Sequence, residues 1–232
     1  MYQGIKRLFH VAFILALVAI VAIARVQENR SRLTSTAPEG LILIDPGHGG
    51  EDGGASAADG TLEKTINLEI ALDLRDLMTL FGFPVEMTRV ADVSIHDADC
   101  TTTRQMKVSD MNNRLKQYNA AAVTVSIHQN HFSVSKYCGT QVFYSTAHPL
   151  GAQLAASVRE SVITYLQPQN TREIKAATDN IFLLHRTVKP AILVECGFLS
   201  NEQERDRLKQ SDYQKQLAMT ILAGLLDVYQ HK

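Results

Sequence analysis

Short apolar runs alternate with amphipathic segments along most of the chain. Strand-type runs, either wholly apolar or alternating, occur at 41–44, 83–87, 123–127, 140–144, 181–184 and 191–194. Apolar residues recur at every third or fourth position in 62–80, 111–118, 150–165 and 213–228, as on a helix with one buried face. This order predicts a single α/β domain, with a mostly parallel twisted sheet and helices on both faces.

Two hydroxyl residues predict where helices begin. Ser109 precedes one amphipathic segment and is expected to cap it, while Ser200 and Gln203 have the spacing of a capping box that opens a polar helix. Residues 95–107 form a long polar excursion before the first of these helices.

The N-terminal region has a different character. Residues 11–24 contain no polar side chain, and the basic residues Lys6 and Arg7 precede them. An apolar run without a polar face argues against an amphipathic core helix and indicates an export signal. Residues 1–24 are predicted to be a cleaved signal peptide, with Ala22-Ile23-Ala24 resembling a cleavage site, or an uncleaved signal anchor. Under both interpretations the rest of the chain is extracytoplasmic, exported across the membrane or anchored in it.

Composition and charge distinguish a linker from the folded domain and limit the partners of that domain. Residues 25–40 are rich in Ser, Thr and charge and are predicted to be a linker to a catalytic domain at 41–232. The first forty residues hold five basic and two acidic groups, which leaves 18 basic and 22 acidic groups and a net charge of −4. An acidic domain argues against a nucleic-acid partner and against attraction to anionic lipid.

Three cysteines in an exported domain allow one disulfide at most. Cys196 follows an apolar run and is expected to be buried, so Cys100 and Cys138 are the candidate pair.

Three titratable side chains follow predicted buried strands. His48 follows 41–44, His128 follows 123–127 and Glu195 follows 191–194. The carboxyl ends of parallel strands meet at one edge of a sheet, where α/β proteins bind ligands. Their convergence predicts a functional site, and two imidazoles with a carboxylate and a water are the ligands of a catalytic zinc ion.

A third protein ligand is needed for such an ion. Glu63 begins a predicted helix just after the glycine-rich loop that contains His48, and it is the first candidate. The alternative interpretation is a first-turn carboxylate favoured by the helix dipole. Glu69 and Glu86 are weaker candidates, because neither begins an element beside that loop.

Four blocks of sequence carry a resemblance to a known family. They are Asp45-Pro46-Gly47-His48-Gly49-Gly50 with Gly53-Gly54-Ala55, then Glu63, then Ser126–Asn130, then Val194–Asn201. In order and spacing they resemble the zinc-dependent N-acetylmuramoyl-L-alanine amidases of the type-3 family. The resemblance implies one Zn²⁺ per chain on His48, Glu63 and His128, with Glu195 as catalytic acid/base. It also implies peptidoglycan as substrate, cut at the amide between N-acetylmuramic acid and L-alanine.

Three further segments resemble one subgroup of this family. Residues 109–114, 139–144 and 167–175 are similar to the membrane-anchored spore-cortex amidases of spore-forming bacteria. That similarity implies a role in cortex maturation through muramic lactam formation, and so in germination. Two features depart from the family pattern, the excursion at 95–107 and His131, which stands where a small residue is usual. His131 either touches the metal or substrate or is a solvated loop residue.

Other polar residues are candidates for supporting roles. Asn130, Arg172 and Lys175 are expected to contact substrate, the two cations by binding muropeptide carboxylates, although surface cations are also often merely solvated. Asp45 either accepts a ring N–H from a ligand histidine or simply ends its strand.

The alternative enzyme is a zinc peptidase of related fold that cuts within wall peptides, and only the products distinguish the two. A binding module with a degenerate metal site is disfavoured, because all four key residues are present. The sequence contains no wall-binding repeat, so targeting is assigned to the N-terminal segment or to a partner protein, and the need for an activating partner stays open.

Overall fold

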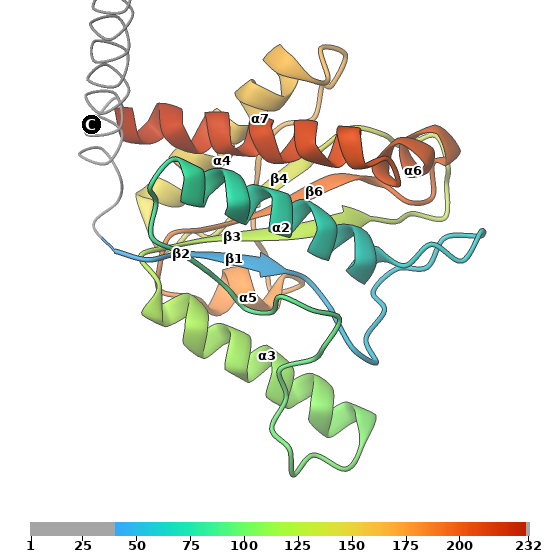
Figure 1. Cartoon of the computed structure of the whole chain (residues 1–232), viewed down its shortest axis with the longest axis vertical. Helices are drawn as coiled ribbons and strands as arrows, with labels where there is room; N and C mark the ends of the chain where they lie inside the picture. Colours follow the sequence, from blue (N-terminus) through green and yellow to red (C-terminus); the bar gives the residue numbers. More distant parts are fainter. Residues whose placement is uncertain (1–39, 231–232) are drawn as a thin grey trace, which may run out of the picture. The chain divides into compact units, whose positions relative to one another are not determined.

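The apolar runs assemble into one mixed sheet in the computed structural model, which describes residues 40–230. The strands are β1 (Ile42–Pro46), β2 (Val85–Met87), β3 (Val123–Asn130), β4 (Gln141–Tyr144), β5 (Lys175–Ala176) and β6 (Ala191–Phe198). Their order across the sheet is β2-β1-β3-β6-β4-β5, and β4 runs antiparallel to its neighbour β6 whereas the other pairs are parallel. Parallel β1, β3 and β6 therefore lie side by side, with their carboxyl ends at one edge (Figure 1).

Helices cover both faces of the sheet, as predicted (Figure 1). One face carries α2 (Glu63–Leu80), α4 (Pro149–Tyr165) and α7 (Ser211–Gln230), with α7 packed against both of the others. The other face carries α3 (Thr103–Ala120) and α5 (Phe182–Arg186), while the short α6 (Glu202–Leu208) follows β6. The predicted single α/β architecture is confirmed.

The attachment of α3 differs from that of the opposite helices. Of its 18 residues only Arg114 and Tyr118 are fully buried, whereas α2 of the same length buries seven. Tyr118 packs with Leu43, Ala121 and Leu183, in a small cluster between α3, α5 and β1. Met111 and Leu115 are partly buried against this cluster, so α3 is held by Arg114, Tyr118 and one small apolar cluster rather than by a fully buried face.

The strand predicted at 181–184 is wrong. Phe182 begins the helix α5, which buries Leu183 and Leu184 and turns Phe182 and His185 outward. A run of four apolar residues cannot distinguish a strand from a buried helical turn. Here both sides of β6 are already paired, with β3 and with β4, so the segment packs on the face of the sheet.

Both predicted helix caps are displaced, one by several residues and the other by one. Thr102 caps α3 in a capping box with Gln105, so the polar excursion becomes helical from Thr103 onward. Asn201 caps α6, and Ser200 instead accepts a hydrogen bond from the backbone of Phe132 at 3.1 Å. Ser, Thr and Asn side chains can all cap a helix, so the sequence alone does not decide which of them does. Tertiary contacts, such as the one between Ser200 and Phe132, make that choice.

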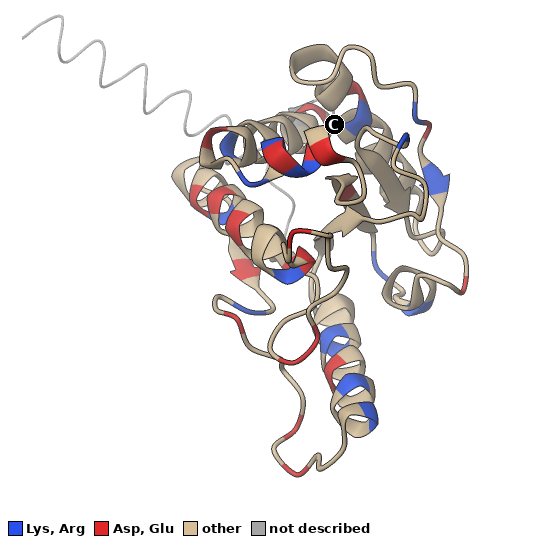
Figure 2. Ribbon diagram, turned by 90° about the vertical axis from the view of Figure 1, so that its right-hand side faces the viewer, with Lys and Arg blue, Asp and Glu red and all other residues tan. Residues whose placement is uncertain are grey.

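The predicted export segment at 1–24 lies outside the described residues, as does the linker at 25–40 apart from Gly40. None of the helices described between residues 40 and 230 has the length and apolarity needed to cross a bilayer. Acidic and basic residues are interspersed along the helices of this region (Figure 2).

Candidate active site

The carboxyl ends of β1 and β3 bring two histidines together. After β1 ends at Pro46, the chain enters a glycine-rich loop in which His48 has a φ of 63°. The ring centroids of His48 and His128 are 5.1 Å apart. Gly47 allows this approach, because a side chain at that position would overlap the His128 ring. The loop therefore needs both the glycine and the unusual backbone angle of His48 to place this pair.

Glu63 lies between the two imidazoles. As the first residue of α2 it is 4% exposed, with Oε2 3.3 Å from His48 Nε2 and Oε1 2.9 Å from His128 Nδ1. The backbone N–H groups of Ala55 and Gln129 donate to the same carboxylate at 2.8 and 3.1 Å. Burial alone would raise the pKa of Glu63, but hydrogen bonds from His128 and His48 hold it well below its usual range. Glu63 is therefore an ionised ligand candidate and more than a first-turn charge.

His48, Glu63 and His128 form a group that could hold a metal ion. Their ligand atoms all lie within 4.8 Å of one another, and no other such group of three is found among residues 40–230. Two imidazole nitrogens with one carboxylate oxygen leave a coordination position for water or substrate, as in catalytic metal sites. The donor set fits a divalent metal that accepts both nitrogen and oxygen ligands.

Asp52 orients His48 from the other side of the ring. Its Oδ1 lies 3.1 Å from His48 Nδ1, which leaves Nε2 facing Glu63. Burial would lower the pKa of His48, but Asp52 and Glu63 outweigh it and raise the pKa to about 9. Two carboxylates around one imidazole favour a positive charge at this point, whether a proton or a metal ion supplies it.

Asp45 does not accept a ring N–H from a histidine, so that interpretation is wrong. The carboxylate is fully buried and accepts hydrogen bonds from Arg114, from Tyr118 at 2.6 Å, from Thr88 at 2.7 Å and from Ser126 at 3.0 Å. Arg114 also donates to the backbone oxygen of His48 at 2.8 Å. Asp45 therefore acts on the site indirectly, by fixing the arginine that holds the His48 backbone.

Glu195 faces the metal group from β6. The strand continues to Phe198, so Glu195 lies within it and stands opposite His128 in the register of β3 and β6. Burial raises the pKa of Glu195 to about 7, with His128 opposing the rise and Glu63 adding to it. Its Oε2 is buried and has no hydrogen-bond partner among the described residues. A buried unpaired carboxylate oxygen of this pKa is suited to exchanging a proton with a water or substrate beside it.

These groups line a cleft of about 300 Å³. Its walls come from His48, His128 and Glu195, from the segment before and within α5, and from α3, whose contributors are Lys107, Asp110, Met111, Arg114 and Tyr118. A smaller hollow of about 150 Å³ shares His48, Asp52 and Lys107 with it and continues along α3. The cleft therefore runs along the sheet-facing side of α3.

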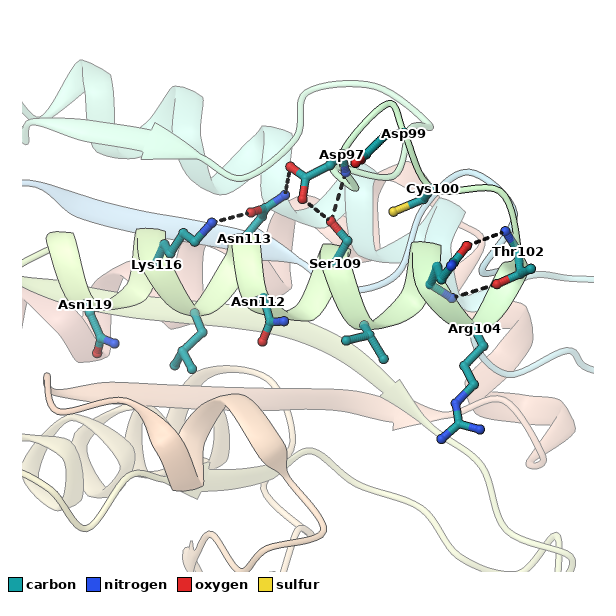
Figure 3. A pocket seen from close by; sticks show the side chains of 13 residues that line it. Asp97, Asp99, Cys100, Thr102, Arg104, Ser109, Asn112, Asn113, Lys116 and Asn119 are labelled. Carbon is teal, nitrogen blue, oxygen red and sulfur yellow. Dashed lines mark hydrogen bonds between the residues drawn. The ribbon is translucent and has the colours of Figure 1, made fainter.

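A larger hollow of about 910 Å³ follows another side of α3 (Figure 3). Its polar side chains bond to one another: Asp97 accepts from Ser109 at 2.7 Å and from Asn113 at 3.0 Å, and Lys116 donates to Asn113 at 3.1 Å. None of His48, Glu63, His128 or Glu195 lines it. The larger volume of this hollow does not make it the reaction site, because the metal group and Glu195 lie outside it.

The three residues expected to contact substrate lie outside the cleft lining. Asn130 ends β3 opposite Phe198, and Lys175 is exposed on the two-residue edge strand β5. Arg172 donates to the backbone oxygen of Cys138 at 2.7 Å, and its guanidinium lies 4.4 Å from the centroid of the Phe198 ring. Lys107 and Asp52 do line the cleft but were not predicted from the sequence, because their positions depend on the packing of α3 and on the loop geometry.

The remaining candidates take other positions. Glu69 accepts a hydrogen bond from Gln214 at 2.6 Å, Glu86 is exposed on β2, and His131 is exposed after β3. None of them belongs to the metal group. Of the three carboxylates considered as third ligand, Glu63 is therefore the one that lies with the two histidines.

The candidate pair Cys100 and Cys138 is not bonded, and all three cysteines are free. Cys100 lines the large hollow along α3, whereas Cys138 lines a different pocket beside Arg172. Cys196 is buried, as predicted.

The fold and the site define a hydrolase of α/β architecture with a His-Glu-His metal group and a carboxylate of raised pKa beside it. Residues 42–227 match the family model described as N-acetylmuramoyl-L-alanine amidase. The chain belongs to this amidase family and is a peptidoglycan hydrolase of the cell wall. Because peptidoglycan lies outside the cytoplasmic membrane, its site of action is extracytoplasmic.

Individual relatives agree with this assignment. The germination-specific N-acetylmuramoyl-L-alanine amidase of Bacillus subtilis is 33% identical over 194 residues, which cover 83% of this chain and 81% of that protein. The CwlD amidase of Clostridioides difficile, solved in complex with the GerS lipoprotein, is 38% identical with a TM-score of 0.78. That match covers 82% of this chain and 98% of the solved chain. The amidase AmiC2 of Nostoc punctiforme is 28% identical with a TM-score of 0.67, covering 84% of this chain and 99% of the solved one.

Proposed function

We propose that the protein is a zinc-dependent amidase that hydrolyses the bond between the lactyl group of N-acetylmuramic acid and the L-alanine of the stem peptide. The observation that carries the proposal is the unpaired, buried Oε2 of Glu195 beside the group His48, Glu63 and His128. Zinc on these three ligands supplies Lewis-acid polarisation of the amide carbonyl and a more acidic water.

Proton transfer and the positioning of the metal ligands are assigned to side chains and backbone groups of this protein. Glu195, with a pKa of about 7, accepts a proton from the attacking water and delivers it to the departing amine of L-alanine. Asp52 fixes the His48 ring with Nε2 turned to the ligand position, and the backbone N–H groups that bond Glu63 keep its carboxylate in place. Arg114 holds the loop that carries His48.

The experiment compares three forms of residues 38–232, a region that corresponds to nearly the whole of the solved amidase domains. They are the parent, Glu195→Gln, and the matched control Glu86→Gln, which alters an exposed glutamate on β2. Zinc content is measured by elemental analysis, and products from muropeptides are identified by mass spectrometry. We expect about one zinc in all three, and release of peptides with a free L-alanine amino terminus by the parent and control only.

The products also separate the amidase from a peptidase of related fold. Cleavage between two amino acids of the stem peptide would identify a peptidase and refute the proposed bond. Zinc binding with no product, both by the domain alone and with the lipoprotein partner added, would refute the assignment of the substrate, and a domain that binds no zinc would refute the mechanism.

We further propose that the substrate is spore cortex and that the action leads to muramic lactam formation. The support is the resemblance to the germination-specific amidase of Bacillus subtilis. A Bacillus subtilis strain lacking that amidase is supplied with this chain or with its Glu195→Gln form, and cortex digests are analysed for muramic lactam. Restoration by the active form alone is expected, and absence of lactam with a stably produced active chain would refute the cortex role.

We also propose that residues 1–24 direct export or anchor the enzyme, and that an exported lipoprotein binds the catalytic domain. The second idea is supported by the similar CwlD amidase of Clostridioides difficile, which was solved in complex with the GerS lipoprotein. Mass measurement of the chain recovered from a bacterial host distinguishes cleavage after Ala24 from retention. Co-elution with a co-produced lipoprotein of the same organism tests the partner, and separate elution at micromolar concentration contradicts it.

A further inference from the structure

The cleft contains one basic side chain that no buried network uses. Within the part of the chain that the structure describes, Lys107 and Arg114 are the only lysine or arginine side chains that line the cleft and its continuation. Arg114 is 2% exposed, and its nitrogens bond Asp45, Asp110 and the backbone oxygens of Pro46 and His48. The side chain of Lys107 is 65% exposed, and its nearest acidic contact is Asp52 Oδ2 at 3.5 Å. Lys107 is therefore available to bind an anion that enters the cleft.

The position of Lys107 relates it directly to the metal group. It lies on the same side of α3 as Met111, Arg114 and Tyr118, and burial increases along this row toward Tyr118, so Lys107 stands at the mouth. The two oxygens of Asp52 contact Lys107 Nζ and His48 Nδ1. One carboxylate therefore separates the lysine from a metal ligand.

We propose that Lys107 binds the free α-carboxylate of the second stem-peptide residue, D-glutamate. This inference rests on the proposed cleavage at the N-acetylmuramoyl–L-alanine bond. An extended chain advances about 3.5 Å per residue, so this carboxylate lies roughly 7 Å beyond the scissile amide. The other ionised groups along this part of the cleft are Glu51, Asp52 and Asp110, which repel an anion. Lys107 therefore sets the position of the peptide arm along α3.

The test uses two muramyl tripeptides that differ only in whether the α-carboxyl of D-glutamate is free or amidated. The parent enzyme is compared with Lys107→Ala, with Lys107→Arg, and with the matched control Lys116→Ala. Lys116 lies on the same helix but lines the large hollow outside the cleft (Figure 3). For each enzyme, kcat and KM are measured on both substrates, together with zinc content.

We expect the parent to show a KM roughly fivefold lower for the free carboxylate, the size expected of a partly exposed ion pair. Lys107→Ala should remove this preference through KM with kcat and zinc content retained, because the contact exists equally before and during the reaction. Lys107→Arg should keep the preference, and Lys116→Ala should match the parent.

Equal KM values for the two substrates with the parent, or an unchanged preference in Lys107→Ala, would overturn the inference while the amidase function stands. If the parent releases no free L-alanine amino terminus from either substrate, the proposed function and this inference fail together.

Discussion

The buried carboxylate of Asp45 should be one of the largest single contributors to the stability of the domain. We consider Asp45→Asn, which keeps the shape of the side chain but removes its charge. The amide cannot neutralise Arg114, which is 2% exposed. If its oxygen stays at the position that faces Arg114 and Thr88, its NH₂ group meets the hydroxyl groups of Tyr118 and Ser126, which donate to the carboxylate in the parent. Removing one partner of a buried ion pair typically costs about 3–5 kcal/mol, a large part of the stability of a domain.

The pH dependence of the free energy of unfolding gives a second, independent magnitude for the contribution of Asp45. Burial would raise the pKa of Asp45, but Arg114 and then the hydrogen bonds from Tyr118 and Thr88 lower it from 3.8 to about 2. Because the folded pKa lies below the unfolded value, the charge stabilises the fold above pH 4, and this contribution disappears as the pH falls toward 2. The shift corresponds to about 2 kcal/mol in total, of which about 1 kcal/mol is lost between pH 5 and pH 3.

The assay is urea unfolding of residues 38–232 at pH 7, pH 5 and pH 3, in the presence of a chelator so that metal binding does not contribute. Asp45→Asn should be less stable than the parent by about 3 kcal/mol or more at pH 7, and the difference should shrink by about 1 kcal/mol from pH 5 to pH 3. The control is Asp76→Asn, since the Asp76 side chain is 69% exposed and pairs with the adjacent Arg75. A difference at pH 7 no larger than that of the control, or one independent of pH, would refute the reasoning.

Three further predictions concern the site. Asp52→Ala should weaken zinc affinity about 10- to 100-fold in competition with a chromogenic chelator, because His48 loses the acceptor that orients it, and unchanged affinity would contradict this role. Glu195→Gln should stabilise the metal-free domain by about 3 kcal/mol at pH 8 but not at pH 4, because a carboxyl with a raised folded pKa destabilises the fold increasingly as the pH rises from its ordinary value of 4.5 to the folded value of about 7; equal stability of the two forms at pH 8 would be the negative result. Gly54→Ala should abolish zinc binding measured by calorimetry, since a methyl group there lies 2.6 Å from Glu63 Oε2 and 2.7 Å from the His48 ring, whereas Gly60→Ala, which has a similar positive φ and open space, should bind zinc normally.

Much of the fold follows from local patterns. The central strands and the long helices were predictable because each buries one face or both faces, and the spacing of apolar residues records that burial. The first half of α3 has no apolar pattern, since most of it is exposed, although the Thr102-x-x-Gln105 capping box was a readable signal. The α5 segment was missed because four apolar residues fit a strand and a helical turn equally well.

The site was predictable to the extent that its residues follow strands or begin a helix. His48, His128, Glu63 and Glu195 converge because β1, β3 and β6 are neighbours and α2 begins beside the loop. The supporting groups could not be predicted in this way. Asp45 bonds residues 43 to 81 positions away, and the role of Lys107 depends on which side of α3 faces the sheet.

The manner in which α3 is fastened has a consequence for how the enzyme fails. Arg114 anchors the helix and also holds the backbone of His48, while Lys107 and Met111 on the same helix form a wall of the cleft. Partial detachment of α3 would open the cleft and release the metal-ligand loop in one event. A heat-stressed molecule would thus lose its substrate cleft and the geometry of its metal ligands together, so its activity would end without a stage of reduced selectivity.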